Sequence, residues 1–162
     1  VDRVVTVDER WIALAVLRLA ELEKGVVEGA GAAPLAALLA GTLPELRGKK
    51  VLLPLCGGNI DLNLLGHVIE RGLVADGRLC QFTARIADRP GGIARLSAIL
   101  AELDVSIKEI DHERQFTGQD LFTVSVRFVV ETTGHDQIHR LRDRLVAEGQ
   151  DVTFTDLDAG MS

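Results

Sequence analysis

The second half of the chain alternates between two hydrophobic periods, and these predict strands and helices in turn. Apolar residues at every second position predict half-buried strands, and apolar residues three and four apart predict amphipathic helices. The predicted elements are a strand at 79–86, a helix at 93–103, strands at 105–112 and 121–130, a helix at 137–148 and a strand at 152–154. On the last helix the predicted core residues are Ile138, Leu141, Leu145 and Val146. This order, βαββαβ in about 80 residues, predicts a ferredoxin-like module.

The first half has longer apolar runs. Thr6 followed by Glu9 fits a capping box and predicts a helix that continues to about residue 23. Residues 26–40 are almost all small and apolar, which predicts a buried helix with Pro34 near its first turn. The unbroken apolar run at 51–55 is typical of a strand that is covered on both faces.

A further helix and a turn complete this half. Residues 60–72 predict a helix with Gly72 as its stop; the expected inward residues are Leu62, Leu65, Val68 and Ile69. Residues 74–77 are turn-like, so we place a boundary there, between a first unit at 1–75 and a second unit at 78–162. A buried helix and a buried strand need other elements packed on both sides, and about 75 residues contain too few elements to bury both of them. We therefore expect the first half to be the end of a larger α/β domain, and the chain to be a fragment of a longer protein.

The composition is typical of a soluble globular protein, with 162 residues, 47% hydrophobic and 26% charged, and a net charge of -6. The acidic balance, the lack of a Lys/Arg cluster and an aromatic content of 4% argue against nucleic-acid partners. The apolar run at 26–40 is too short and too interrupted to span a membrane. Cys56 and Cys80 suggest no disulfide framework, so we expect a cytoplasmic protein.

Residues 55–61 hold the first candidate site. The sequence Leu-Cys-Gly-Gly-Asn-Ile-Asp predicts the end of a buried strand, a glycine turn and a helix start. Backbone N–H groups and the positive end of a helix converge at such a junction and can cradle a ligand. The candidate binding residues are Cys56, Gly57, Gly58 and Asn59. The alternative interpretation is that Cys56 is simply a small buried residue at a strand end.

Glu28 is an isolated carboxylate among small apolar residues. A buried carboxylate must be paired or functional, so one interpretation places it at a binding site. The other interpretation is a helix-start carboxylate that is satisfied by backbone N–H groups.

A second glycine turn, at residues 88–92, precedes the predicted helix at 93–103. The free N–H groups at the start of that helix could bind the carboxylate of an amino acid, although the same residue types suit an ordinary strand-to-helix turn. His135 and His139 have metal-ligand spacing on a predicted helix, but no third ligand is evident. A solvated helix face is favoured there, and we predict no metal site.

Both halves resemble known families, and the two families occur in this order in one group of enzymes. The second half resembles an ACT domain, a small ferredoxin-like module that often binds amino acids, in residues 88–93, in Ile107 and in residues 112–114. The first half resembles the C-terminal end of the catalytic domain of threonine dehydratase (threonine ammonia-lyase), a fold-type II pyridoxal-phosphate enzyme. The residues that carry this second resemblance are 26–32, 56–61 and 68–73.

The resemblance to threonine dehydratase implies a cofactor and an activity. Threonine dehydratases use pyridoxal 5′-phosphate to deaminate L-threonine or L-serine to the 2-oxo acid and ammonia. Cys56, where the family more often has Ser, would hydrogen-bond the pyridine nitrogen of the cofactor, and Glu28 would lie near its ring. Gly57, Gly58 and Asn59 would complete this side of the cofactor site.

The resemblance to an ACT domain implies a regulatory ligand. The ACT half would bind an amino-acid effector, with isoleucine or valine the first choices, and would regulate the catalytic domain. The expected contacts are Asp88, Pro90, Gly91, Gly92, Ile93 and Ile107. Pairing of two ACT modules would make a homo-oligomer. Ser106 stands where such domains commonly have Asn, which bears on the identity of the effector.

The departures from the enzyme pattern predict an inactive chain. The Schiff-base lysine of the family lies in a Ser-Phe-Lys type motif, which this sequence does not contain, and the lysines at 24, 49, 50 and 108 have other contexts. The glycine-rich phosphate loop is missing as well. We therefore expect no catalytic residue in this chain and a need for upstream catalytic-domain residues. The alternative is a non-catalytic amino-acid sensor or dimerisation module that retains a piece of the parent fold.

Overall fold

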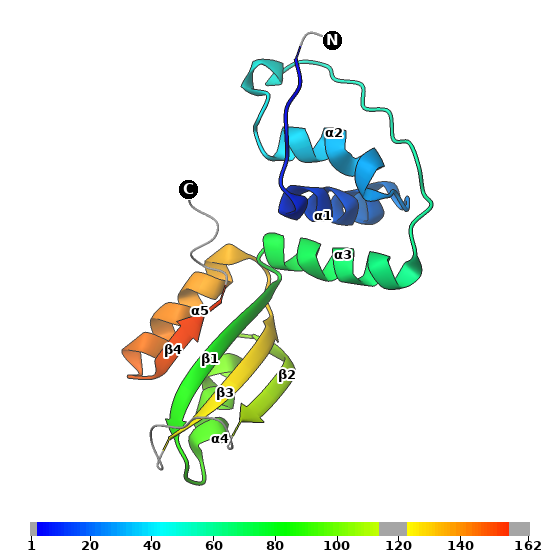
Figure 1. Cartoon of the computed structure of the whole chain (residues 1–162). Coiled ribbons are helices and arrows are strands. Elements are labelled where there is room, and N and C mark those ends of the chain that lie inside the picture. The colour runs from blue at the N-terminus through cyan, green and yellow to red at the C-terminus, as the bar shows by residue number, and fades with distance from the viewer. Residues whose placement is uncertain (1–2, 114–122, 156–162) are drawn as a thin grey trace. The chain divides into compact units, whose positions relative to one another are not determined.

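The computed structural model describes residues 3–113 and 123–155 of the chain (Figure 1). The chain divides into two compact units, Val1–Asp76 and Gly77–Ser162. Each unit has a hydrophobic core of its own, so each is described by itself. None of the helices in the described residues is long and apolar enough to cross a membrane.

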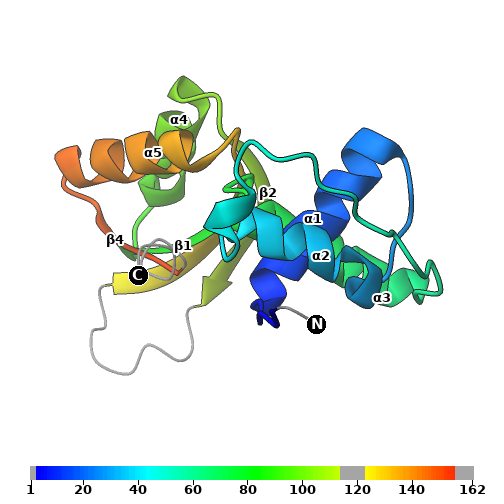
Figure 2. The same ribbon diagram turned by 90° about the horizontal axis from the view of Figure 1, so that it is seen from above.

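The first unit is helical. Its elements are α1 (Glu9–Arg18), which continues as a π-helical turn (Leu19–Glu23), α2 (Gly29–Leu39), a 3₁₀ turn (Pro44–Leu46) and α3 (Leu62–Ala75). Helix α1 packs against both α2 and α3 (Figures 1 and 2). The buried core is made of small and aliphatic side chains, namely Ala15, Val16, Leu19, Val27, Ala32 and Ala36.

The helix starts differ from the sequence prediction in two places. Helix α1 begins after Asp8, which makes no side-chain capping bond, so the capping box predicted from Thr6 and Glu9 is wrong. Pro34 lies within α2 rather than in its first turn, because that helix begins at Gly29. At α3, by contrast, the Asp61 carboxylate accepts hydrogen bonds from the N–H groups of residues 63 and 64, at 2.9 and 3.2 Å, and so caps the helix.

Gly72 does not end α3, as predicted, but lies buried inside it. A Cβ on Gly72 would lie 2.8 Å from the carbonyl oxygen of Ala13 and 2.9 Å from Cβ of Leu17. The missing side chain therefore lets α3 approach the backbone of α1 closely. On the predicted apolar face, Leu65 and Val68 pack on the core, whereas Leu62 is 79% exposed.

The strand predicted at 51–55 is wrong. Residues 51–61 have no regular secondary structure, and Leu52 is 93% exposed. A strand is stable only when neighbouring strands satisfy its backbone groups. Among residues 3–76 the structure has no strand that could do so, and the segment runs as an extended loop (Figure 1).

The second unit is a four-stranded antiparallel sheet with two helices on one face (Figure 2). Its elements are β1 (Leu79–Ala87), α4 (Gly92–Glu102), β2 (Ser106–Glu113), β3 (Thr123–Glu131), α5 (His135–Ala147) and β4 (Asp151–Phe154). The strand order is β2-β3-β1-β4. The predicted βαββαβ ferredoxin-like fold is confirmed; residues 121 and 122 of the predicted third strand lie outside the described residues.

The core of this unit fills the space between the sheet and the helices. Phe82 and Phe128 are Cα partners across β1 and β3, and their rings stack with centroids 5.0 Å apart. Cys80 is also buried there. Val146, predicted to lie in the core, is 59% exposed, and Gln137 is buried instead. The Gln137 amide nitrogen donates to the Leu103 carbonyl oxygen at 2.8 Å, so this buried polar group has a hydrogen-bond partner.

Candidate functional site

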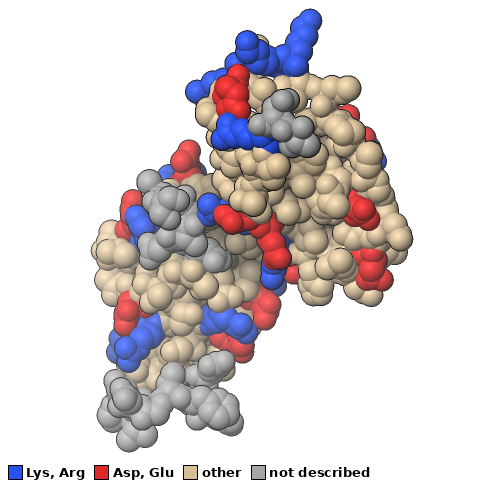
Figure 3. Space-filling model, turned by 45° about the horizontal axis from the view of Figure 1, so that its top comes forward, with Lys and Arg blue, Asp and Glu red and all other residues tan. Residues whose placement is uncertain are grey.

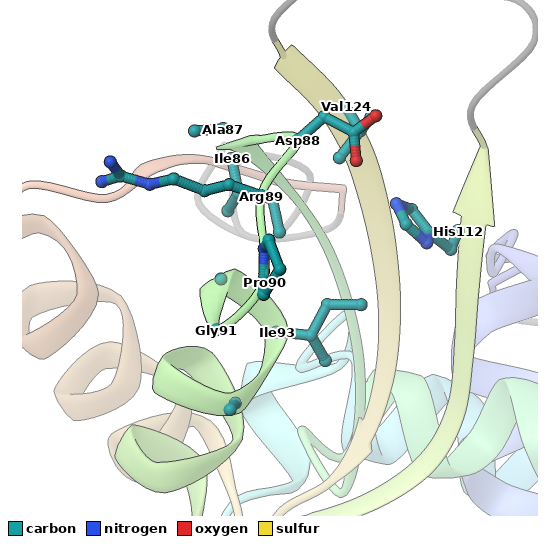
Figure 4. A pocket seen from close by; sticks show the side chains of 11 residues that line it. Ile86, Ala87, Asp88, Arg89, Pro90, Gly91, Ile93, His112 and Val124 are labelled. Carbon is teal, nitrogen blue, oxygen red and sulfur yellow. The ribbon is translucent and has the colours of Figure 1, made fainter.

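A pocket of about 400 Å³ lies at the turn between β1 and α4 (Figure 4). The end of β1, the turn and the first turn of α4 supply most of its lining, from Ile86 to Ala94. His112 on β2 and Val124 on β3 complete it. The pocket therefore joins segments that are far apart in the sequence at one end of the sheet.

The start of α4 gives the pocket unsatisfied backbone donors. The first N–H groups of a helix have no acceptor within the helix and need a side-chain cap, water or a ligand. The residue before α4 is Gly91, with φ at 100°, and it supplies no side-chain cap. This left-handed backbone suits glycine and is strained for other residues. The pocket thus has a site for an anionic group at the positive end of α4.

The remaining lining is largely apolar. Ile86, Ile93 and Val124 come from three different elements and surround the space in front of the turn. A Cβ on Gly92 would lie 2.9 Å from Cδ1 of Ile86, so the glycine keeps this wall open. Arg89 is exposed and extends away from the pocket in Figure 4. The lining suits a ligand with an aliphatic side chain and an anionic end.

The structure brings together five of the six residues predicted for the effector. All five line the pocket: Asp88, Pro90, Gly91, Gly92 and Ile93. Ile107 does not line it. That residue is 38% exposed and lies near the opposite end of β2 from His112, so its role stays a prediction.

His112 is the pocket residue to which sequence reasoning gave no role. Its Cα partner on β3 is Val126, which is fully buried, so the imidazole lies on the core face of the sheet. Nε2 of His112 is buried and has no hydrogen-bond partner among the described residues. The side chains of Asp88 and Ile93 extend toward the side on which His112 lies (Figure 4). Arg114, from the same resemblance motif, lies outside the described residues.

A second cluster lies in the first unit, where the two motifs at 26–32 and 56–61 meet. The N–H of Glu28 donates to the carbonyl oxygen of Gly57 at 3.0 Å. A Cβ on Gly57, whose φ is 85°, would overlap the Glu28 carboxylate. A Cβ on Gly31 would overlap the carbonyl oxygen of Cys56. Glycine is therefore needed on both sides of this contact, and the predicted cofactor residues lie next to one another.

The exposure of this cluster contradicts one of the earlier interpretations. Cys56 is exposed, as are Gly57, Gly58 and Asn59, so the interpretation of Cys56 as a buried strand-end residue is wrong. Glu28 is half-buried and precedes α2, but its carboxylate makes no capping bond to that helix. The carboxylate and the thiol-bearing turn thus form one surface that is open to a ligand.

The possible metal ligands and the surface charges point to no further site among the described residues. The described residues contain no group of three or more His, Cys, Asp or Glu side chains that could hold a metal ion. On α5, His135 is exposed and His139 is half-buried. Acidic and basic side chains are interspersed on the second unit in the view of Figure 3.

Comparison with known proteins identifies the second unit. The sequence pattern of the family described as ACT domain matches residues 83–150. Residues 83–150 are an ACT domain. Among solved structures, the ACT domain from GTP pyrophosphokinase of Chlorobium tepidum matches 48% of this chain and 97% of its own, with 15% identity and a TM-score of 0.38.

The whole chain is homologous to threonine ammonia-lyases. It is 42% identical, over 92% of its length, to the L-threonine ammonia-lyase of Geobacter sulfurreducens. Over 94% of its length it is 36% identical to the enzyme of that name from Thermotoga maritima. The chain spans 37% of the length of each relative. The predicted resemblance to threonine dehydratase, with an ACT domain in the second half, is confirmed.

Proposed function

We propose that this chain is the C-terminal portion of a pyridoxal-phosphate-dependent threonine/serine dehydratase, and that its ACT domain binds an amino-acid effector. The observation that supports the effector site most directly is the pocket at the uncapped start of α4. The intact enzyme would deaminate L-threonine or L-serine to the 2-oxo acid and ammonia. Cys56 and Cys80 form no disulfide with each other, which fits a reducing compartment that we take to be the cytoplasm.

The pocket suits a branched aliphatic amino acid. The N–H groups at the start of α4 would bind its carboxylate, because they are donors without intrahelical acceptors at the positive end of the helix. Ile86, Ile93 and Val124 would contact its side chain. A volume of about 400 Å³ is within the usual range for small-molecule sites. Isoleucine and valine are therefore the first effectors to test.

Calorimetric titration of the chain with L-isoleucine, L-valine, L-threonine and L-serine tests the effector site. We expect heat of binding and a rise in melting temperature with a branched-chain amino acid. Gly92→Ala should weaken binding by about tenfold or more, because the added methyl group pushes Ile86 into the pocket. Gly66→Ala is the matched control, since a Cβ on this helical glycine meets nothing within 4 Å. No binding of any of the four amino acids would disprove the effector site.

The cluster around Cys56 fits one wall of a pyridoxal-phosphate site. Gly57 and Gly31 let the glycine turn pack directly against Glu28 and the start of α2, and the exposed Cys56 thiol can hydrogen-bond a ring nitrogen. The half-buried Glu28 carboxylate lies against Gly57. When bound, the cofactor supplies an electron sink for loss of the β-hydroxyl group. Upstream residues would supply the lysine and the phosphate loop, so we propose that this chain alone is inactive.

Two measurements test the cofactor wall. After the chain is mixed with pyridoxal phosphate and unbound and weakly bound cofactor is removed by gel filtration, the chain should retain no visible absorbance of a lysine-bound cofactor; stoichiometric retained absorbance would contradict the proposal that the lysine lies elsewhere. In the intact enzyme, Cys56→Ser should keep most of the activity, whereas Cys56→Val should lower kcat/KM by about tenfold or more. Because the thiol is exposed, neither change should lower the melting temperature. Equal activity of the two variants would disprove a hydrogen-bonding role.

We also propose that two ACT domains pair through β2. This strand is at the edge of the sheet, and Ile107 and Ile110 on it are 38% and 42% exposed. An edge strand with free backbone groups and exposed apolar residues is a natural surface for pairing. The same edge would serve the alternative function, a non-catalytic dimerisation module. Sedimentation of the chain should show a dimer that Ile110→Lys weakens; a monomer at all concentrations would disprove it.

A further inference from the structure

His112 combines burial with an unused hydrogen-bonding atom. The ring lies on the core face of β2, opposite the buried Val126, and lines the pocket. Its Nε2 is buried without a hydrogen-bond partner among the described residues. An unsatisfied buried polar atom destabilises a fold, so native proteins keep few of them, and each needs a reason. A ligand in the pocket that completes the hydrogen bond would be such a reason.

Different parts of the pocket supply its hydrogen-bond donors and its hydrogen-bond acceptors. The start of α4 offers only backbone N–H donors, which suit an anionic group and cannot accept a hydrogen bond from a cationic one. Asp88 and His112 carry the hydrogen-bond acceptors among the side chains that line the pocket. Asp88 is exposed, whereas Nε2 of His112 is buried. Nε2 accepts when the imidazole is neutral and its proton is on Nδ1.

We propose that His112 recognises the α-ammonium group of an amino-acid ligand, with Nε2 as the hydrogen-bond acceptor. The carboxylate of the ligand would lie at the start of α4 and its side chain against Ile93. This role rests on the proposed effector site. His112 would be the residue that distinguishes an amino acid from a carboxylic acid of the same shape.

The test compares two ligands and three variants of the full chain. L-Isoleucine has the ammonium group, and 3-methylpentanoate is the same molecule without it. His112→Leu should weaken L-isoleucine binding by about tenfold, the loss of one hydrogen bond to a charged group, and change 3-methylpentanoate binding by less than about twofold. His112→Gln, which keeps an amide oxygen at a similar reach, should restore most of the affinity. His139→Leu, a change outside the pocket, should affect neither ligand.

The melting temperature without ligand separates recognition from support of the fold. His112→Leu removes the unsatisfied nitrogen, so the unliganded variant should melt at or above the temperature of the unchanged chain. A lower melting temperature together with equal losses for both ligands would show a structural role and overturn the proposal. Unchanged L-isoleucine binding in His112→Leu would also overturn it, while leaving the effector site intact. If the unchanged chain binds neither ligand, the effector site itself fails, and this role with it.

Discussion

The N–H of Glu28 donates a hydrogen bond to the carbonyl oxygen of Gly57 at 3.0 Å, and this bond joins the motifs at 26–32 and 56–61 through two residues that are 29 positions apart. Around it, Gly31 lies directly against the carbonyl oxygen of Cys56. The backbone of the exposed glycine turn is thereby held at the start of α2. The geometry of the proposed cofactor wall depends on this close approach, which can be tested without the cofactor.

Gly31→Ala should destabilise the first unit. The added Cβ would overlap the Cys56 carbonyl oxygen and lie 2.7 Å from Cγ1 of Val27. Because a backbone oxygen cannot move aside as a side chain can, we expect a loss of roughly 1–3 kcal/mol in the free energy of unfolding. Trp11, the single tryptophan of the chain, packs on the core of this unit, so its fluorescence during denaturant unfolding reports this loss.

Gly25→Ala is the control for this change. A Cβ on Gly25 meets nothing within 4 Å, so the free energy of unfolding should change by less than about 0.5 kcal/mol. If Gly31→Ala behaved like Gly25→Ala, the two motifs would not be in contact and the proposed cofactor wall would lose its basis.

Gly72→Ala should also destabilise the first unit, although alanine is the better helix former. The Cβ would lie 2.8 Å from the Ala13 carbonyl oxygen and force α1 and α3 apart. We expect a net loss of roughly 1–3 kcal/mol by Trp11 fluorescence. Gly66→Ala on the same helix has open space and should gain up to about 1 kcal/mol. Stabilisation by both changes would contradict the close helix contact at Gly72.

The fold of the second unit could be predicted from sequence because all the partners of its elements lie within it. Phe82 on β1 and Phe128 on β3 are buried as the alternation of a half-buried strand implies, and Leu141 on α5 is buried as helical spacing implies. The first unit could not be predicted as well. The run at 51–55 has the composition of a buried strand, but no strand lies among residues 3–76 to pair with it. The composition of a segment indicates its tendency to form a strand, but the strand forms only where another strand pairs with it.

The turn at residues 88–92 was predictable because its glycine residues mark it in the sequence, whereas the place of His112 in the pocket was not. Simple alternation from Ile107 places position 112 on the opposite face of β2. The register shifts between Ile107 and Glu109, and this bulge turns the following residues over. Ile107 and His112 consequently pair with Val130 and Val126, both of which are buried. A single irregularity in pairing, which sequence periodicity does not reveal, thus brings the imidazole to the pocket.

Gln137→Leu should destabilise the ACT domain in spite of the apolar surroundings. The amide oxygen of Gln137 accepts from the N–H of Thr133 at 2.7 Å, and its nitrogen donates to the Leu103 carbonyl oxygen at 2.8 Å. Leucine would leave both backbone groups without these partners. Each unsatisfied group should lower the free energy of unfolding by up to about 1–3 kcal/mol. Thermal unfolding followed by circular dichroism measures the effect. Gln81→Leu removes an exposed hydrogen bond from the amide nitrogen to the Thr155 hydroxyl and should have little effect; equal losses would contradict the role of burial.

Glu148 should make the stability of the ACT domain depend on pH in the acid range. Hydrogen bonds from Arg95 and then from Arg144 lower the pKa of Glu148 below its ordinary value of 4.5. Arg95 approaches from α4, at 2.9 Å, so the carboxylate links this helix to the end of α5.

A pKa that is lower in the folded state means that the unfolded chain takes up the proton more readily. The contribution of Glu148 is therefore complete above about pH 4.5, the unfolded value, and is lost as the pH falls through the folded value. Glu148→Gln should lower the melting temperature at pH 7, and the gap to the unchanged chain should narrow on acidification toward pH 3. Glu131→Gln, at an exposed carboxylate on β3, serves as the control. A gap that stays constant with pH would contradict the coupling of Glu148 to the two arginines.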